Sequence, residues 1–262
     1  MGRAIEIISG FVTNPAGTLT PWTMATGDSN AVRNFSLQTQ AHLEDAWGVS
    51  QAAGALEVKS PKMHDNVQGI LLGVPANDAS PLLPDEMRQL LYPQDTLIIS
   101  QSGDAMDTDC GSLLVAYDDL PGANARIVTW DQVKALVKNY LTVQTTHTTG
   151  GAAGDYGGAQ PINSVTDLLR ANTDYALLGY SVNVEVVSVG WRSPDFSNYR
   201  IGGPATAKVI ETRDYFIRKA MVSGDPWIPV FNSANKGSTF VDLTSTDTGE
   251  TIVVTSYLAQ IS

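Results

Sequence analysis

The chain of 262 residues has a single cysteine, Cys110, and only three histidines, His42, His64 and His147. One thiol excludes an intramolecular disulfide framework and any zinc site built from several cysteines. No two histidines are closer than 22 positions, which excludes a local histidine-rich metal motif. The fold must therefore rest on packing and hydrogen bonds rather than on covalent or metal crosslinks.

Positive charge is also scarce, with 16 lysines and arginines against 27 acidic residues and a net charge of -11. No segment gathers the cations into an arm. Because neutralising phosphates requires clustered cations, we expect no direct nucleic-acid binding. The N-terminus, MGRAIEIISGF, lacks the long apolar core of a signal peptide or a membrane anchor, so we expect a chain that is soluble when made.

What the sequence does contain is a series of short apolar runs separated by turn residues. YSVNVEVVSVGW, ETIVVTSYLAQI and GSLLVAYDDL combine β-branched residues with alternating or continuous hydrophobicity. Glycine, proline, serine, threonine, asparagine and aspartate lie between such runs along the whole chain. This pattern predicts an all-β fold.

One segment has helical spacing. After Thr129, the apolar residues recur on one helix face, and Thr129 with Gln132 forms a capping box. These apolar residues are Val133, Leu136, Val137, Tyr140 and Leu141. The spacing predicts a helix of about three turns, followed by a glycine-rich loop or linker over residues 145–161. Shorter helices are expected at 84–91 and 165–171.

The two halves of the chain share landmarks in the same order. Ser-Pro pairs at 60–61 and 193–194 are 133 positions apart, and each is followed by an asparagine and a Pro-Ala pair. Gly111 and Gly249, which are expected to open the last strand of each half, are 138 apart. The order indicates two copies of one β-sandwich. The alternative is a chance similarity of common turn residues.

The predicted domain organisation follows from this repeat. Residues 1–126 are assigned to the first jelly-roll β-sandwich and residues 175–262 to the second. Residues 127–174 are assigned to a helical and glycine-rich connection between them. The expected fold class is therefore all-β, with two tandem jelly-roll β-sandwiches joined by a helix and a Gly-rich loop.

Catalytic signatures are absent from the sequence pattern. His64 stands beside Asp65 and Asn66, but no nucleophile elbow accompanies it, and a turn histidine bonded to the backbone is the simpler interpretation. Cys110 has no nearby cation to activate its thiol. We therefore expect no enzymatic activity, no catalytic residues and no cofactor.

One acidic turn is a candidate metal site. In SGDAMDTDCGS, the carboxylates of Asp104, Asp107 and Asp109 crowd a glycine-bounded turn and could bind calcium through oxygen alone. The spacing differs from that of an EF-hand loop. A solvated hairpin turn without a metal is the alternative.

Two tandem sandwiches without a catalytic constellation resemble the double jelly-roll major capsid proteins of tailless, often membrane-containing viruses. The resemblance is one of layout over the whole chain, without a diagnostic motif. It implies a structural shell protein, a viral major capsid or coat protein, that self-assembles as trimeric pseudo-hexagonal capsomers. It further implies a location in the virion capsid shell after a soluble stage in the host cytoplasm, and contacts with other virion proteins or an internal membrane.

A second hypothesis is a carbohydrate- or ligand-binding β-sandwich module, which could also be calcium-dependent. In that case the tryptophans would stack on sugar rings, whereas in a structural protein they would fill the cores. The residues concerned are Trp22, Trp47, Trp130, Trp191 and Trp227.

Overall fold

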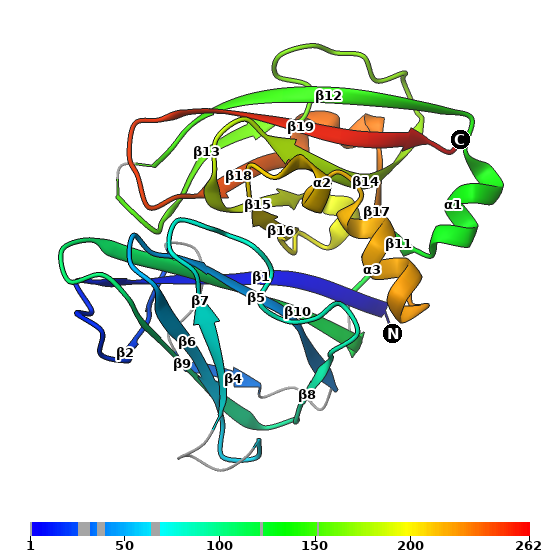
Figure 1. Ribbon diagram of the computed structural model, residues 1–262. Helices are drawn as coiled ribbons and strands as arrows, with labels where there is room; N and C mark the ends of the chain where they lie inside the picture. The colour runs from blue at the N-terminus through cyan, green and yellow to red at the C-terminus, as the bar shows by residue number, and fades with distance from the viewer. Residues whose placement is uncertain (1, 26–31, 36–39, 64–68, 121–122, 151) are drawn as a thin grey trace.

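A computed structural model describes residues 2–25, 32–35, 40–63, 69–120, 123–150 and 152–262. The predicted all-β class is confirmed, because four antiparallel sheets form two sandwich-like bodies (Figure 1). In the described part of the chain, no helix is both long enough and apolar enough to cross a membrane.

The first body contains two sheets. Sheet A has the strand order β2-β9-β6-β7, with β4 also paired to β9, and sheet B has the order β3-β1-β10-β5-β8. The strands are β1 (Gly2–Thr13), β2 (Thr20–Pro21), β3 (Thr23–Met24), β4 (Val32–Phe35), β5 (Ala41–Val49), β6 (Gly54–Lys59), β7 (Ile70–Val74), β8 (Gln89–Leu91), β9 (Asp95–Ser102) and β10 (Thr108–Leu120).

The second body contains sheet C, with the order β13-β18-β15-β16, and sheet D, with the order β11-β17-β14-β19-β12. Its strands are β11 (Ile127–Val128), β12 (Asn139–Thr148), β13 (Tyr156–Pro161), β14 (Asp174–Val182), β15 (Val186–Arg192), β16 (Ile201–Ala205), β17 (Ile228–Asn232), β18 (Phe240–Thr244) and β19 (Thr251–Gln260). Its helices are α1 (Trp130–Leu136), α2 (Val209–Thr212) and α3 (Tyr215–Ser223), with 3-10 turns η1 (Pro194–Phe196) and η2 (Ser233–Ser238).

Both bodies have the same strand order. In the first, the eight principal strands in chain order are β1, β2, β5, β6, β7, β8, β9 and β10, and in the second they are β12 to β19. In sheets B and D, the first, eighth, third and sixth strands of the body lie side by side in that order. In sheets A and C, the order is second, seventh, fourth and fifth. This is the order of a jelly roll, so the chain carries the fold twice and the two bodies are called the first and second roll.

Sheet B lies inside the molecule and is buried on both faces. Ala4 and Ile8 of β1 belong to the core between sheets A and B, whereas Ile5 and Ile7 belong to the core that continues into the second roll. The contacts of β1 and β10 with β15 and β16 place sheet C on the second face of sheet B (Figure 1). The layers therefore follow the order A, B, C, D, which explains the almost continuous apolar run in β1.

The two rolls stand side by side with the same ends together. Asp107 and Thr108 at the β9–β10 turn line a polar cavity of about 80 Å³ with Thr246 and Asp247 at the β18–β19 turn. These two turns join the seventh and eighth strands of their rolls. The axes of the rolls are therefore parallel and not inverted.

The Ser-Pro corners are equivalent, as the repeat predicts. Ser60 follows the fourth strand of the first roll, is fully buried, and donates to Asp95, the first residue of the seventh strand. Ser193 follows the fourth strand of the second roll, is fully buried, and shares a hydrogen bond of 2.9 Å with Thr239, which precedes the seventh strand. Each serine fixes the same corner of its roll.

The predicted connection over 127–174 is wrong, because this stretch supplies β11, β12 and β13 to the second roll. The expected helix occurs with its capping box but ends at Leu136, since the Lys138 amide already bonds the Gln260 carbonyl and β12 begins. The expected glycine-rich loop contains the end of β12 and all of β13. Threonines at alternating positions make β12 a strand with one buried face.

The other helical predictions also differ from the structure. Residues 84–91 form a turn followed by β8, and residues 165–171 form no helix. The helical residues that the pattern missed are in α2 and α3, between the fifth and sixth strands of the second roll. Helix α3 ends at Gly224, whose φ of 71° is the left-handed conformation that glycine favours at this position.

Candidate functional site

The two rolls approach each other over small residues. Ile7 of sheet B lies above Gly202 of sheet C, where a Cβ atom would come within 2.7 Å of the Ile7 Cδ1 atom. The Ile7 amide donates a hydrogen bond of 2.8 Å to the Arg200 carbonyl oxygen. A Cβ atom at position 202 would also lie 1.9 Å from the Val189 carbonyl oxygen within sheet C, so the strand geometry itself requires glycine there.

Polar side chains satisfy one another inside the contact. The hydroxyl of Ser112 lies 2.7 Å from that of Ser9 and 2.6 Å from that of Ser188, and all three side chains are buried. Trp47 donates from Nε1 to the Val187 carbonyl oxygen at 2.8 Å. Because these serines and Trp47 pair their polar groups across the rolls, the contact is specific as well as apolar.

Charged groups on sheet C are also paired. Asp242 is 1% exposed and accepts hydrogen bonds from Arg192 Nε at 3.0 Å and Arg200 Nε at 3.1 Å. The Arg200 guanidinium carbon lies 3.3 Å from the ring centroid of Tyr156, whose hydroxyl bonds Ser9 of the first roll at 2.6 Å. This chain of contacts links β13 to sheet B.

Helix α3 connects the rolls through a buried ion pair. Lys219 Nζ lies 3.1 Å from Asp45 and 3.0 Å from Asp85 of the first roll. Burial alone would lower the pKa of Lys219, but the attraction of these two carboxylates raises it above the usual value, so the amine stays charged. Tyr215 donates to Asp45 at 3.2 Å and satisfies a further lone pair.

A second charged cluster lies beside the first, since Lys219 Nζ also donates to the Glu44 carbonyl oxygen at 3.3 Å. Arg88 of the first roll lies 2.9 Å from Glu44 and 2.7 Å from Asp225, which follows α3. Arg3 is 3.1 Å from the same Asp225 carboxylate. Burial raises the pKa of Glu44, although Arg88 and Arg3 oppose this effect. The cluster pairs acids and bases across the rolls and shows no free nucleophile.

The structure places the three predicted metal ligands at the β9–β10 turn but does not join them into a ligand set. Asp104 Oδ1 accepts from the Met106 amide at 2.6 Å, and the carbonyl of Asp107 accepts from Asn14 at 2.9 Å. Asp109 is fully buried, and burial raises the pKa of its carboxyl. Among the described residues, no group of three or more His, Cys, Asp or Glu side chains could hold a metal ion. Calcium therefore gains no support from this geometry.

The remaining candidates have structural surroundings. His64 lies outside the described residues, so its turn role stays a prediction. Cys110 is buried, and burial raises the pKa of its thiol far above the usual value. His147 is buried, with Nδ1 2.7 Å from the Gly158 carbonyl and Nε2 2.6 Å from the Thr145 hydroxyl.

Four of the five tryptophans fill the cores, since each is at most 2% exposed; they are Trp22, Trp47, Trp191 and Trp227. Only Trp130 is partly exposed. The tryptophan platforms that a sugar-binding module would use are therefore not on the surface.

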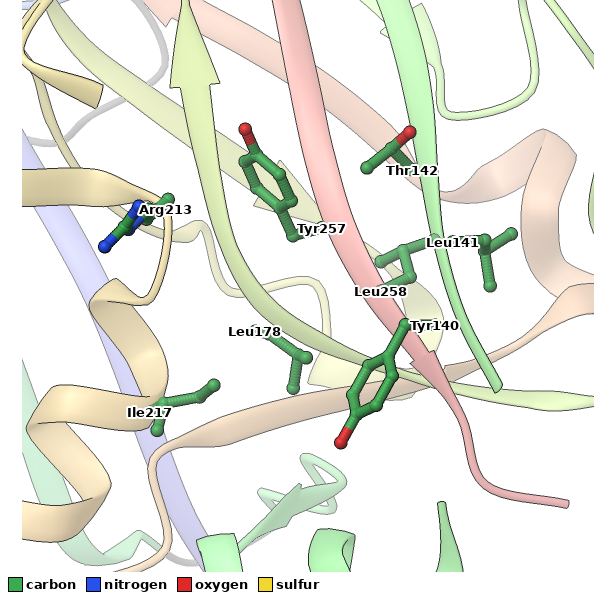
Figure 2. A pocket seen from close by; sticks show the side chains of 8 residues that line it. All are labelled: Tyr140, Leu141, Thr142, Leu178, Arg213, Ile217, Tyr257 and Leu258. Carbon is green, nitrogen blue, oxygen red and sulfur yellow. The ribbon is translucent and has the colours of Figure 1, made fainter. Parts of the chain in front are cut away.

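A groove on the outer face of sheet D was not foreseen from the sequence. It has a volume of about 490 Å³ and lies between β12 and helices α2 and α3, with β14 and β19 as its floor (Figure 2). Tyr140 on β12 is 63% exposed, and Ile217 of α3 lies on the other side. The lining residues are Tyr140, Leu141, Thr142, Leu178, Arg213, Ile217, Tyr257 and Leu258. The helical spacing that includes Tyr140 and Leu141 predicts a helix here, but both residues lie in β12.

Comparison with known proteins yields only weak structural similarity. No family model matches the sequence, and no curated protein matches it significantly. The exported protein XepA of PBSX is 10% identical, with 97% of this chain and 86% of that chain covered and a TM-score of 0.25. The major capsid protein P2 from bacteriophage PM2 is 9% identical, with 99% and 98% covered and a TM-score of 0.22. A triple jelly-roll protein of an archaeal virus is 10% identical, with 100% and 80% covered and a TM-score of 0.24.

Proposed function

We propose that this chain is a structural shell protein, a viral major capsid protein that self-assembles through its jelly rolls. The observation that carries the proposal is the repeated strand order, with the rolls parallel and joined by a buried contact. A shell subunit needs a rigid block with large outer faces more than it needs a pocket. The contact through sheets B and C supplies that rigidity, because its polar groups are paired across the rolls.

The proposed assembly unit is a trimer. Three chains contribute six rolls of the same strand order, so a threefold arrangement becomes close to sixfold, as a pseudo-hexagonal capsomer requires. The proposal includes no enzymatic activity and no nucleic-acid binding. Location in a virion shell, and contacts with other virion proteins or an internal membrane, belong to the same proposal.

The test is the state of the purified chain in solution. Light scattering coupled to size-exclusion chromatography should show trimers or larger assemblies, and negative-stain images should show ring-shaped tiles or shells. The concentration range should extend from micromolar to millimolar, because shell contacts between single subunits can be weak. A chain that remains monomeric over this whole range would overturn the proposal.

A further inference from the structure

The repeated strand order shows which outer faces are covered and which are not. Sheet B of the first roll and sheet D of the second have equivalent positions, and so do sheets A and C. In the described part of the chain, sheet B is covered by sheet C, whereas no sheet lies against the outer face of sheet D, and helices α2 and α3 contact mainly its strands β14 and β17. We propose that the outer face of sheet D binds the outer face of sheet A of a second copy. This inference rests on the proposed function, since it names the surfaces used in assembly.

The register of the strands identifies the residues that would meet. In sheet B, β5 has an irregularity in its pairing with β10, next to Leu114, and Leu114 pairs with Ile7 on β1. In sheet D, β14 has the same irregularity next to Tyr257, and Tyr257 pairs with Thr142 on β12. Thr142 is therefore the equivalent of Ile7.

The Ser-Pro corners align sheet A of the first roll with sheet C of the second. Gly190 lies three residues before the corner of the second roll and pairs with Gly202. Glu57 lies three residues before the corner of the first roll and pairs with Leu71. Leu71 is therefore the equivalent of Gly202.

Inside the chain, the projecting side chain comes from sheet B. In the proposed contact it comes from sheet A, and the hollow lies on sheet D, the equivalent of sheet B. Within the chain, Ile7 projects from sheet B onto Gly202 of sheet C. Between copies, Leu71 projects from sheet A with 63% of its surface exposed, and it would meet sheet D beside Thr142. Thr142 lines the apolar groove of about 490 Å³, so a hollow lies where the projecting side chain would fit (Figure 2).

Charge favours the same partner. With a net charge of -11 two copies repel each other, but the exposed positions of β12 from Thr142 onward are uncharged: Thr142, Gln144, Thr146 and Thr148. Arg213 at the groove is exposed and forms no ion pair with any residue that the structure describes. Glu57, which pairs with Leu71 across strands, has a carboxylate that is 13% exposed and lies 2.9 Å from Lys59 Nζ. The contact therefore combines an apolar projection with a carboxylate that Arg213 of the other copy would share with Lys59.

The experiment is a disulfide crosslink between two single variants. L71C and T142C are purified separately, mixed in equal amounts and oxidised with copper phenanthroline. The native Cys110 is buried and gives little background. A dimer crosslinked only in the mixture supports the inference. The matched control mixes T142C with M106C, which has 85% exposure at the β9–β10 turn, and should give no dimer.

Charge reversal supplies a second readout on the same surfaces. E57R and R213E alone should each weaken assembly about tenfold, and the chain that carries both changes should recover it. Circular dichroism and urea midpoints must match the wild type for each variant, because Glu57 is only 13% exposed and pairs with Lys59. If the wild type assembles but the L71C–T142C mixture forms no crosslink, the inference is wrong and the proposed function stands. A wild type that never assembles overturns the proposed function as well.

Discussion

Trp47 donates a hydrogen bond from its indole Nε1 to the carbonyl oxygen of Val187 at 2.8 Å, across the contact between the two rolls. Trp47 is fully buried, so its loss leaves both a hole and an unpaired carbonyl. We expect Trp47→Phe to lower the free energy of unfolding by about 1–2 kcal/mol. Urea titration followed by circular dichroism measures it. Trp130→Phe, at a partly exposed site, is the control and should change stability by less than about 0.5 kcal/mol.

Gly202 tests how little space there is for a side chain at this position of sheet C, below Ile7 of the first roll. A Cβ atom there would lie 1.9 Å from the Val189 carbonyl oxygen and 2.7 Å from Ile7 Cδ1. Gly202→Ala should therefore destabilise the chain by about 2–3 kcal/mol. Gly73→Ala is the matched control, since a Cβ atom at this strand glycine of the first roll meets nothing within 4 Å. Equal thermal unfolding midpoints for the two variants would contradict this account of the contact.

The buried ion pair between Lys219 and Asp45 is expected to show strong coupling. Lys219→Met leaves the fully buried Asp45 carboxylate without its cation and should cost about 3–5 kcal/mol. Adding Asp45→Asn removes the uncompensated charge, so the double variant should be more stable than the sum of the two single changes predicts. A double-mutant cycle in urea measures the coupling. Strict additivity would show that the two charges do not interact.

Much of the fold was predictable because it depends on local patterns. The apolar runs predicted the strands, and the Ser-Pro corners at 60–61 and 193–194 predicted two copies of one fold. Ser60 and Ser193 could be recognised because each bonds within its own corner, to the amides of Met63 and Asp195. Such short-range hydrogen bonds leave a signature in the sequence.

The misassigned stretch shows where local patterns fail. Residues 139–148 have helical spacing at their start and threonine alternation at their end, and only the pairing with β19 makes them a strand. The glycine-rich pattern predicts a loop or linker around Gly157, yet this residue lies in β13, where a Cβ atom would come within 2.5 Å of Gly150. Long-range pairing decided both cases, as tertiary context often overrides local preference.

The assembly surfaces were not predictable from the sequence for the same reason. The groove on sheet D joins residues from β12, β14, α3 and β19, which are far apart along the chain. The acidic turn at 103–109 is a candidate metal site in the sequence because its carboxylates are neighbours along the chain. The structure uses Asp104 to accept a hydrogen bond from the Met106 amide, which is a turn-stabilising role.

His147 makes the stability of the second roll depend on pH. Burial lowers the pKa of its imidazole below the usual 6.5, although the Gly158 carbonyl and Asp242 oppose this effect. In the unfolded chain the ring takes up a proton near pH 6.5, while the folded ring stays neutral to lower pH. The stability present above pH 6.5 is therefore lost as the pH falls toward the folded pKa, by at most about 1.4 kcal/mol per pH unit from this residue.

The variant His147→Asn separates this effect from the rest of the chain. An asparagine amide can keep the hydrogen bond to the Gly158 carbonyl, but it does not titrate. Urea midpoints measured at pH 7.5, 6.5 and 5.5 should fall more steeply for the wild type than for the variant. Since His42 also has a lowered pKa, part of the dependence should remain in His147→Asn. Parallel curves for the two proteins would show that the buried imidazole does not control stability in this range.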